Sequence, residues 1–243
     1  MQAFIPAAGL GTRLSPLTEH RPKALVEVDG TPLLKIVIDR LSQFGISRVV
    51  VNVHHFADMV CDYIHSAKWN AEVVVSDETE MLLDTGGGLK KAEPLFNPAE
   101  PILIHNVDVL SAIDFHAMEQ THMRNKNMAT LAVSDRNTSR LLLFDSNQLL
   151  AGWSNLNTGE TKWVQSPTPK YRPVAFSGIA ILHPQLLALM PPADHPYPII
   201  PCYLDIAKTH RISSFVHSSS LWMDVGTPQR LSQAQSWYRS LPK

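Results

Sequence analysis

Short apolar runs recur along the first half of the chain, and each is followed by a polar stretch. They cover residues 3–6, 48–53, 72–76 and 101–109. Short apolar or β-branched runs without helical spacing are typical of strands buried on both faces. The pattern therefore predicts four strands of a buried sheet.

Segments with apolar residues three and four positions apart separate these runs, which is the spacing of one helix face. Over residues 31–45 we expect a helix with Thr31 as N-cap, Pro32 at the first position and Gly45 at the C-terminal end. Two more helices are expected, over about residues 56–66 and 114–126.

The second half of the chain is less regular. Strands are predicted at residues 128–133 and 140–145, and residues 149–153 are expected to pair with the second of these through a turn at 145–147. The polar, proline-bearing segments 156–173 and 191–201 are interpreted as insertions or flaps of one domain, because regular elements resume after each.

Alternation of strands and helices predicts an α/β fold with a mainly parallel sheet. Ligands of such sheets bind beyond the carboxyl ends of the strands. The polar stretches after Pro6, Ser76 and Ile104 are therefore expected to meet at one edge of the sheet.

Composition and charge narrow the class of protein. The 243 residues carry a net charge of −1, with 44% hydrophobic and 18% charged residues, so no nucleic-acid or membrane-binding surface is indicated. The two cysteines, Cys61 and Cys202, are interpreted as free thiols of a reducing compartment. Pro6 and Gly9 come too early for a secretion signal, so we expect a cytoplasmic protein.

The loop after the first strand combines glycines and cations. It lacks the third glycine of a dinucleotide fingerprint, since Leu14 stands there, and it lacks the Gly-Lys-Ser/Thr of a P-loop. Glycines let backbone N–H groups approach an anion, and the nearby cations Arg13, Arg21 and Lys23 neutralise it. The loop is therefore predicted to bind phosphate groups.

The segment "AAGLGTRLSPLTEHRPKAL" resembles the signature G-x-G-T-R-x-x-P-x-T-x-x-x-P-K of the sugar-1-phosphate nucleotidylyltransferases. The resemblance implies one nucleotidyltransferase domain over residues 1–243, a three-layer α/β sandwich with a mixed, mainly parallel sheet. It also implies roles in holding a nucleoside triphosphate for the backbone of Ala8, Gly9 and Gly11 and for the side chain of Arg13. Lys23 would contact the phosphates near the reacting centre, so Arg13 and Lys23 are the catalytic candidates.

A second glycine segment, residues 82–93, resembles the part of the family's site that lies against the base. The three glycines are expected to precede a short helix, with Gly86 and Gly87 offering backbone groups to the base edge and Asp84 accepting from it. A carboxylate accepts N–H donors from a pyrimidine or a guanine, so the segment leaves the base open.

Two aspartates match the family's metal-binding positions. Asp108 ends the fourth apolar run, after Val107 in place of the usual glycine, and Asn106 resembles an asparagine that touches the ribose. Asp224 lies in "WMDVGT". The resemblance implies that Asp108 and Asp224 bind Mg²⁺, with phosphate oxygens and water completing the shell.

The segment "FSGIAILHP" resembles the family's sugar-binding strand and makes Ser177 and Gly178 the sugar-binding candidates. The Glu-Lys-Pro segment of many members is missing. Its sugar-phosphate lysine would be replaced by Lys162 or Lys170, and a lactyl-bearing sugar would need a cation such as these or Arg172.

The short segments look most like bacterial uridylyltransferases acting on N-acetylmuramate 1-phosphate, a sugar of the cell wall. The alternative enzyme is a mannose-1-phosphate guanylyltransferase. The alternative from another functional class is a non-catalytic regulator that binds sugar nucleotides. The substrates implied are a nucleoside triphosphate and a sugar 1-phosphate. The oligomeric state is left open.

Overall fold

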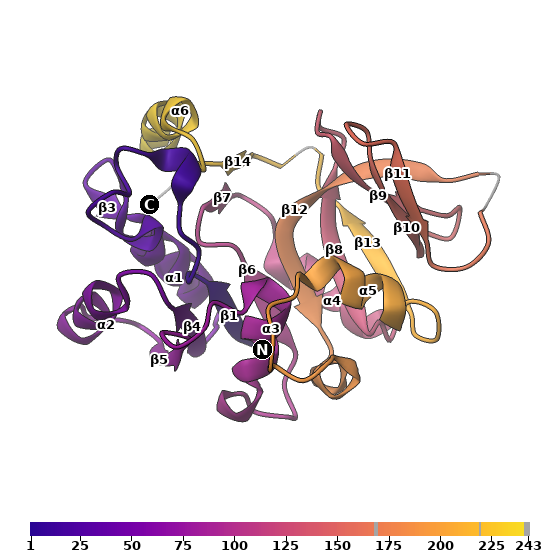
Figure 1. Cartoon of the computed structure of the whole chain (residues 1–243), viewed down its shortest axis with the longest axis horizontal. Helices are drawn as coiled ribbons and strands as arrows, with labels where there is room; N and C mark the ends of the chain where they lie inside the picture. The colour runs from indigo at the N-terminus through magenta and orange to yellow at the C-terminus, as the bar shows by residue number, and fades with distance from the viewer. Residues whose placement is uncertain (168–169, 219, 241–243) are drawn as a thin grey trace.

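The computed structural model describes residues 1–167, 170–218 and 220–240 (Figure 1). Seven strands form its central sheet, and six of them run in one direction while β12 runs against its neighbours β6 and β8. In spatial order the strands are β5 (Glu72–Asp77), β4 (Arg48–Val53), β1 (Gln2–Pro6), β6 (Ile102–His105), β12 (Arg172–Leu182), β8 (Ala129–Ser134) and β13 (Ile212–Val216). The mixed, mainly parallel central sheet expected from the sequence is confirmed.

The long strand β12 also starts an antiparallel extension of the sheet. Its first residues pair with β9 (Arg140–Phe144), which pairs with β10 (Leu150–Asn155) and then β11 (Glu160–Trp163). The extension stands to one side of the molecule (Figure 1). The hairpin predicted through the turn at residues 145–147 is thus confirmed.

Alternating side chains divide the sheet between two hydrophobic layers. On β1, Ala3 and Ile5 enter one core and Phe4 enters the other, and all three are fully buried. The first core is covered by α1 (Leu33–Gln43), α2 (Ala57–Ser66), α4 (Phe115–Arg124) and α6 (Pro228–Ser240). The second is covered by α3 (Asp84–Lys91) and α5 (Ile199–Ile206). The three-layer sandwich follows from this alternation.

Short elements complete the chain and support the loops around the sheet. The two-residue strands β2 (Glu27–Val28) and β3 (Thr31–Pro32) pair with each other, as do β7 (Val109–Ser111) and β14 (Trp222–Asp224). Single 3₁₀ turns cover Thr12–Leu14, Lys23–Leu25, Glu93–Leu95 and Pro184–Leu189.

Most helix positions are as expected, but one boundary is wrong. Thr31 does not cap α1, because it lies in β3, and α1 begins at Leu33, whose N–H donates to the Val26 carbonyl at 2.9 Å. A tertiary partner therefore replaces the expected side-chain cap. Gly45 does end this helix, with φ of +76°.

The second glycine segment also differs from expectation. Gly86, Gly87 and Gly88 lie inside α3 and not before it. Tyr197 and Glu78 occupy the space where their side chains would be, so these positions require glycine. The proline-bearing segment around Tyr197 is thus packed against α3. None of the described helices is both long and apolar enough to cross a membrane.

Candidate active site

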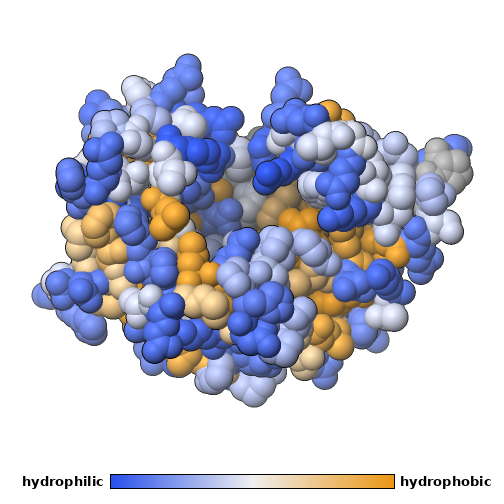
Figure 2. All heavy atoms as spheres, in the orientation of Figure 1, coloured by the Kyte–Doolittle hydropathy of each residue, from blue (hydrophilic) through white to orange (hydrophobic). Residues whose placement is uncertain are grey.

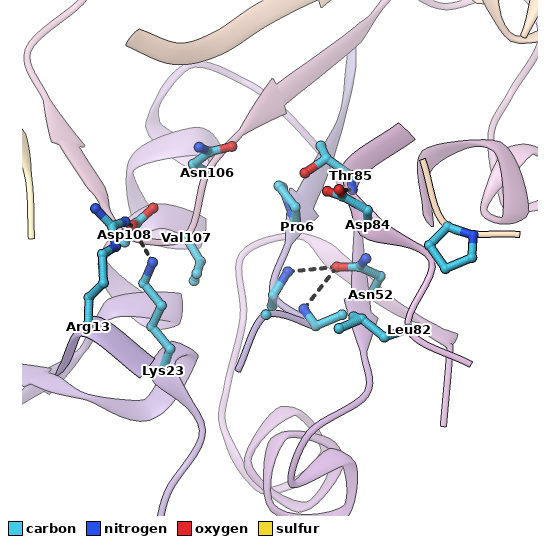
Figure 3. A pocket seen from close by; sticks show the side chains of 14 residues that line it. Pro6, Arg13, Lys23, Asn52, Leu82, Asp84, Thr85, Asn106, Val107 and Asp108 are labelled. Carbon is cyan, nitrogen blue, oxygen red and sulfur yellow. Dashed lines mark hydrogen bonds and ion pairs between the residues drawn. The ribbon is translucent and has the colours of Figure 1, made fainter. Parts of the chain in front are cut away.

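The strands β1, β4, β5 and β6 run parallel, so the polar stretches after Pro6, Ser76 and Ile104 lie at the same edge of the sheet, as predicted. Pro6 is in register with Asn52, and Asn52 with Ser76. Figure 2 shows a hollow between the upper parts of the two halves of the molecule. A cavity of about 550 Å³ lies at this edge. Its lining comprises Pro6, Ala7, Ala8, Gly9, Arg13, Lys23, Asn52, Leu82, Asp84, Thr85, Asn106, Val107, Asp108 and Pro196 (Figure 3).

The first glycine loop is fixed by its own backbone and one side chain. Gly11 has φ of +66°, and its carbonyl accepts a hydrogen bond from the Thr18 hydroxyl at 2.9 Å. A Cβ on Gly11 would lie 3.0 Å from Cβ of Lys23, so a larger residue would displace the lysine. Gly11 lines a smaller pocket beside the main cavity, together with Arg13 and Gly226.

Two cations of this loop converge on Asp108. The Lys23 ammonium donates to Asp108 Oδ2, and Arg13 Nη2 lies 4.0 Å from the same oxygen (Figure 3). The Lys23 and Asp108 side chains keep 16% and 10% of their exposure, whereas Arg13 keeps 64%. Two cations therefore sit beside one carboxylate, and Arg13 remains open to solvent and to ligands.

Strand pairing brings Asp224 to Asp108 from the far end of the chain. Asp224 is in register with Val109 in the β7–β14 pair, and the Val225 N–H donates to the Asp108 carbonyl at 2.8 Å. A Cβ on Gly226 would lie 2.7 Å from Asp224 Oδ1 and 3.2 Å from Asp108 Oδ2. The two predicted carboxylates thus border one shared space.

The two carboxylates are donors that could hold a hard divalent cation such as Mg²⁺. Asp108 and Asp224 supply carboxylate oxygens, the ligand type that Mg²⁺ prefers, and phosphate oxygens and water would fill the remaining positions. Within the described residues, no three His, Cys, Asp or Glu side chains gather as an all-protein metal site.

Of the candidates for contact with the base, Asp84 faces the cavity, whereas Gly86 and Gly87 have their N–H groups occupied. Asp84 lines the cavity with Thr85, in the left-handed backbone region at φ +60°. Non-glycine residues in that region are strained and gather at functional sites. The Gly86 and Gly87 N–H groups both donate to the Tyr197 carbonyl, at 3.0 and 3.2 Å, so these amides are not free for a base edge.

A buried polar network, which the sequence reasoning missed, connects the two glycine segments. Asn52 Oδ1 accepts from the N–H groups of Ala7 and Ala8 at 2.6 and 3.3 Å. Its amide nitrogen donates to Glu78 Oε1 at 2.6 Å, and Glu78 Oε2 accepts from the Leu83 N–H at 3.1 Å. Polar residues at the ends of β4 and β5 were the available signal.

Burial sets the protonation behaviour of this network. Glu78 is fully buried. Burial raises the pKa of its carboxyl, and the Asn52 and Leu83 hydrogen bonds oppose that shift. The Glu78 carboxyl lies against the backbone of α3 at Gly88. It holds the first loop through Asn52, and through the Leu83 N–H it holds the segment that carries Asp84.

The sugar-side candidates are mostly structural in their contacts. The Ser177 hydroxyl is buried and lies 2.7 Å from His217 Nε2. Gly178 has φ of +72°, and a Cβ there would lie 2.7 Å from the Asn106 amide nitrogen. Its carbonyl accepts from the Asn106 N–H at 2.9 Å. Gly178 thus fixes Asn106, which lines the cavity.

The three suggested sugar-side cations lie elsewhere. Lys162 pairs with Glu160 at 3.2 Å, and Arg172 pairs with Asp135. Lys170 lines a separate cavity near Arg172. None of the three lines the main cavity.

A second cavity of about 350 Å³ lies beyond Asp224, and the sequence reasoning did not anticipate it. Arg136, Trp222 and Arg230 line it, together with residues that follow β8 and β13. Asp224 borders this cavity and also approaches Asp108, so the space adjoins the two carboxylates.

Comparison with known proteins agrees with this architecture. Residues 2–141 match the sequence profile of the nucleotidyl transferase family. An N-acetylmuramate alpha-1-phosphate uridylyltransferase from Caulobacter vibrioides is 34% identical over 93% of this chain and 92% of its own. One from Neisseria meningitidis serogroup B is 29% identical over 97% of both chains. Mannose-1-phosphate guanyltransferase from Emericella nidulans is 26% identical over 94% of this chain and 62% of its own.

Solved structures with lower identity share the fold. HddC from Yersinia pseudotuberculosis complexed with GMP-PN has a TM-score of 0.77 at 20% identity, covering 98% of this chain and 99% of that chain. UDP-glucose pyrophosphorylase complexed with UDP-glucose has a TM-score of 0.76 at 16% identity, covering 98% of both.

The fold and the family match together define a nucleotide-dependent transferase of the α/β class. The chain belongs to the nucleotidyl transferase family. It is a sugar-1-phosphate nucleotidyltransferase, and membership of this enzyme family speaks against a purely non-catalytic binder.

Proposed function

We propose that the enzyme transfers UMP from UTP to N-acetylmuramate 1-phosphate and releases pyrophosphate. An oxygen of the sugar 1-phosphate attacks the α-phosphorus in line, and the bond from that phosphorus to the bridging oxygen of the pyrophosphate breaks. The observation that carries the proposal is the 34% identity to a relative of that name over nearly the whole of both chains.

Charge neutralisation and positioning supply the catalysis in this proposal. Arg13 and Lys23 offset the negative charge of the triphosphate, and the backbone of Gly9 and Gly11 binds the phosphates. The Ala8 N–H donates to Asn52 and helps to position the loop. Lys23 is withdrawn from Asp108 by the incoming phosphates, which are a stronger anionic partner.

The remaining contacts divide between base, ribose and sugar. Asp84 accepts from the base and Asn106 touches the ribose. Ser177 and Gly178 are the sugar-side candidates, and Gly178 also holds Asn106 through its carbonyl.

Asp108 and Asp224 would hold Mg²⁺ in this site. Bound with the nucleotide, the ion supplies charge stabilisation for the phosphates that react. The approach of both carboxylates to one point supports this role, because Asp224 Oδ1 and Asp108 Oδ2 lie 2.7 and 3.2 Å from where a Cβ on Gly226 would be.

The second candidate is GTP with mannose 1-phosphate. The alignment with a guanyltransferase over 94% of the chain favours it. The higher identity and the fuller coverage of the uridylyltransferases favour UTP.

A substrate matrix tests the proposal. We expect kcat/KM for UTP with N-acetylmuramate 1-phosphate to exceed that for GTP with mannose 1-phosphate, measured by pyrophosphate release. A clear preference for GTP would overturn the base assignment and leave the reaction class intact.

A further inference from the structure

Arg136 is a cation without an anionic partner in the second cavity. Among the described residues no carboxylate lies within ion-pair distance of it, whereas Arg230 pairs with Asp224 at 3.2 Å and Arg172 pairs with Asp135. Arg136 donates from Nη2 to the Phe176 carbonyl, and its buried Nε has no partner in the described part of the chain. An unmatched charge with an unmet donor is costly unless a ligand supplies the anion.

The guanidinium is also held rigidly. It lies 4.2 Å from the centre of the Trp222 ring, whose Nε1–H donates to the Ser177 carbonyl at 2.9 Å. Stacking on an aromatic face and one fixed hydrogen bond orient the guanidinium before any ligand arrives. Burial lowers the pKa of Arg136, with the charge of Asp224 opposing this and that of Arg230 adding to it.

The position of Arg136 separates it from the phosphate chemistry. The triphosphate candidates Arg13 and Lys23 lie at the first cavity, on the Asp108 side. Arg136 lies in the second cavity, beyond Asp224. A sugar whose 1-phosphate reacts beside Asp108 and Asp224 would place its ring substituents, and not its phosphate, in this second space.

We propose that Arg136 binds a carboxylate carried by the sugar substrate and so makes the enzyme selective for an acidic sugar. This inference rests on the proposed function, since N-acetylmuramate differs from N-acetylglucosamine by a lactyl ether that ends in a carboxylate. A guanidinium binds a carboxylate through paired, charge-assisted hydrogen bonds, which gives both affinity and direction. Arg136 thus takes the place of the suggested Lys162, Lys170 and Arg172.

Two sugar phosphates that differ only in this group provide the test. The ratio of kcat/KM for N-acetylmuramate 1-phosphate to that for N-acetylglucosamine 1-phosphate is measured with UTP for the wild type, Arg136→Gln and Arg136→Lys. We expect the glutamine variant to lower this ratio by about tenfold to a hundredfold. The lysine variant keeps the charge without the planar fork and should fall between. Arg124→Gln, at the exposed end of α4, is the matched control.

A purely structural role would give another result. If Arg136 only fixes Trp222 and Phe176, the variants lower kcat/KM for both sugars in the same proportion, and the inference is overturned. An unchanged ratio overturns it too. Calorimetric binding of the two sugar phosphates to the wild type and to the variants gives the same comparison without turnover.

The binding experiment separates the two proposals. A wild-type enzyme that does not turn over N-acetylmuramate 1-phosphate contradicts the proposed function. If that enzyme still binds the acidic sugar more tightly, and the Arg136 variants lose the difference, the inference stands. If it binds both sugars equally, the inference is wrong.

Discussion

At the scale of single residues, Lys23 and Asp108 form an ion pair that water hardly reaches. The ammonium and the carboxylate keep 16% and 10% of their side-chain exposure. A buried pair of this kind contributes little net stability, since desolvation offsets the attraction. The pair holds the Lys23 ammonium at the wall of the first cavity.

Replacement of Lys23 tests whether this position serves the transition state. We expect Lys23→Ala to lower kcat by about a hundredfold while KM changes less, because the ammonium neutralises charge that grows during the reaction. Steady-state kinetics measure both constants. Lys35→Ala, which removes a surface pair with Asp39, is the control and should leave kcat unchanged. A wild-type kcat in a folded Lys23→Ala protein would reject the role.

Asp224 is predicted to be a metal ligand, and metal binding can be measured without catalytic turnover. With a non-hydrolysable triphosphate analogue bound, we expect Asp224→Asn to weaken Mn²⁺ binding by about tenfold or more, because an amide is a poorer ligand than a carboxylate. Electron paramagnetic resonance of free Mn²⁺ gives the affinity. Asp205→Asn, on the exposed side of α5, should bind Mn²⁺ like the wild type. Equal affinity in the Asp224 variant would remove Asp224 from the metal site.

At the scale of elements, α3 is a helix built to be approached closely. Its three glycines allow the Tyr197 segment and the Glu78 carboxylate to lie directly against its backbone. A Cβ at Gly88 would come within 2.4 Å of Glu78 Oε1. The helix therefore depends on its neighbours for position, and through Asn52 the same carboxylate positions the first glycine loop.

Exchanging donors and acceptors in this network tests the coupling. In Glu78→Gln, the new amide faces a donor at Asn52 or at Leu83, and in Asn52→Asp two carboxylates face each other. We expect each single variant to raise the KM for the triphosphate by about tenfold, the scale of one unmet buried group. The double variant Asn52→Asp/Glu78→Gln restores every donor–acceptor pair and should recover most of the wild-type KM.

The same cycle contains its own control. A network that merely stabilises the fold would lower the free energy of unfolding without changing the KM of the folded enzyme. A double variant no better than the worse single variant, or wild-type KM in both single variants, would contradict the positioning role of Glu78.

At the scale of the whole molecule, one sheet serves two halves with different tasks. The parallel half ends at the edge that carries the first cavity, and the antiparallel extension from β12 stands to one side of the molecule (Figure 1). The strand that joins them, β12, carries Ser177 and Gly178 at its bulge. Both cavities are lined by residues at the ends of strands of this sheet, so both depend on the sheet being folded.

Buried histidines make this stability depend on pH. His122, packed between α4 and β8, is 1% exposed, and burial lowers the pKa of its ring to about 4. Unfolded, the ring titrates near its ordinary pKa of about 6.5. As pH falls from about 6.5 to 4, the unfolded chain gains a proton that the folded chain does not, so stability is present above this window and is lost within it.

Replacement of His122 measures that loss. We expect the free energy of unfolding of the wild type, relative to that of His122→Gln, to fall by about 1.5 kcal/mol between pH 6.5 and pH 5. Urea titrations at the two pH values give the comparison. His65→Gln, at an exposed position on α2, should track the wild type. Parallel pH dependence in the wild type and His122→Gln would refute the assignment.

The local sequence pattern was enough to predict the order of strands and helices, because the spacing of hydrophobic residues indicates which face of an element is buried. The first glycine loop could also be predicted, since Gly11 and the cations Arg13 and Lys23 act within one short segment. Asp108 and Asp224 were each recognisable by their place in a motif. That their two carboxylates lie beside one another could not be derived from either motif.

Only the tertiary structure decided which distant side chains meet. The pairing of β7 with β14 brings Asp224 to Asp108, and the order of β1, β4 and β5 places Asn52 between Ala7 and Glu78. The glycines of the second segment lie inside α3, where Tyr197 packs directly against them. Arg136 has no local signal, because an arginine after a strand is ordinarily solvated. Only the tertiary structure stacks it on Trp222 in a cavity, with no carboxylate at ion-pair distance among the described residues. Such contacts depend on strand order, which results from interactions along the whole chain and cannot be predicted from one segment.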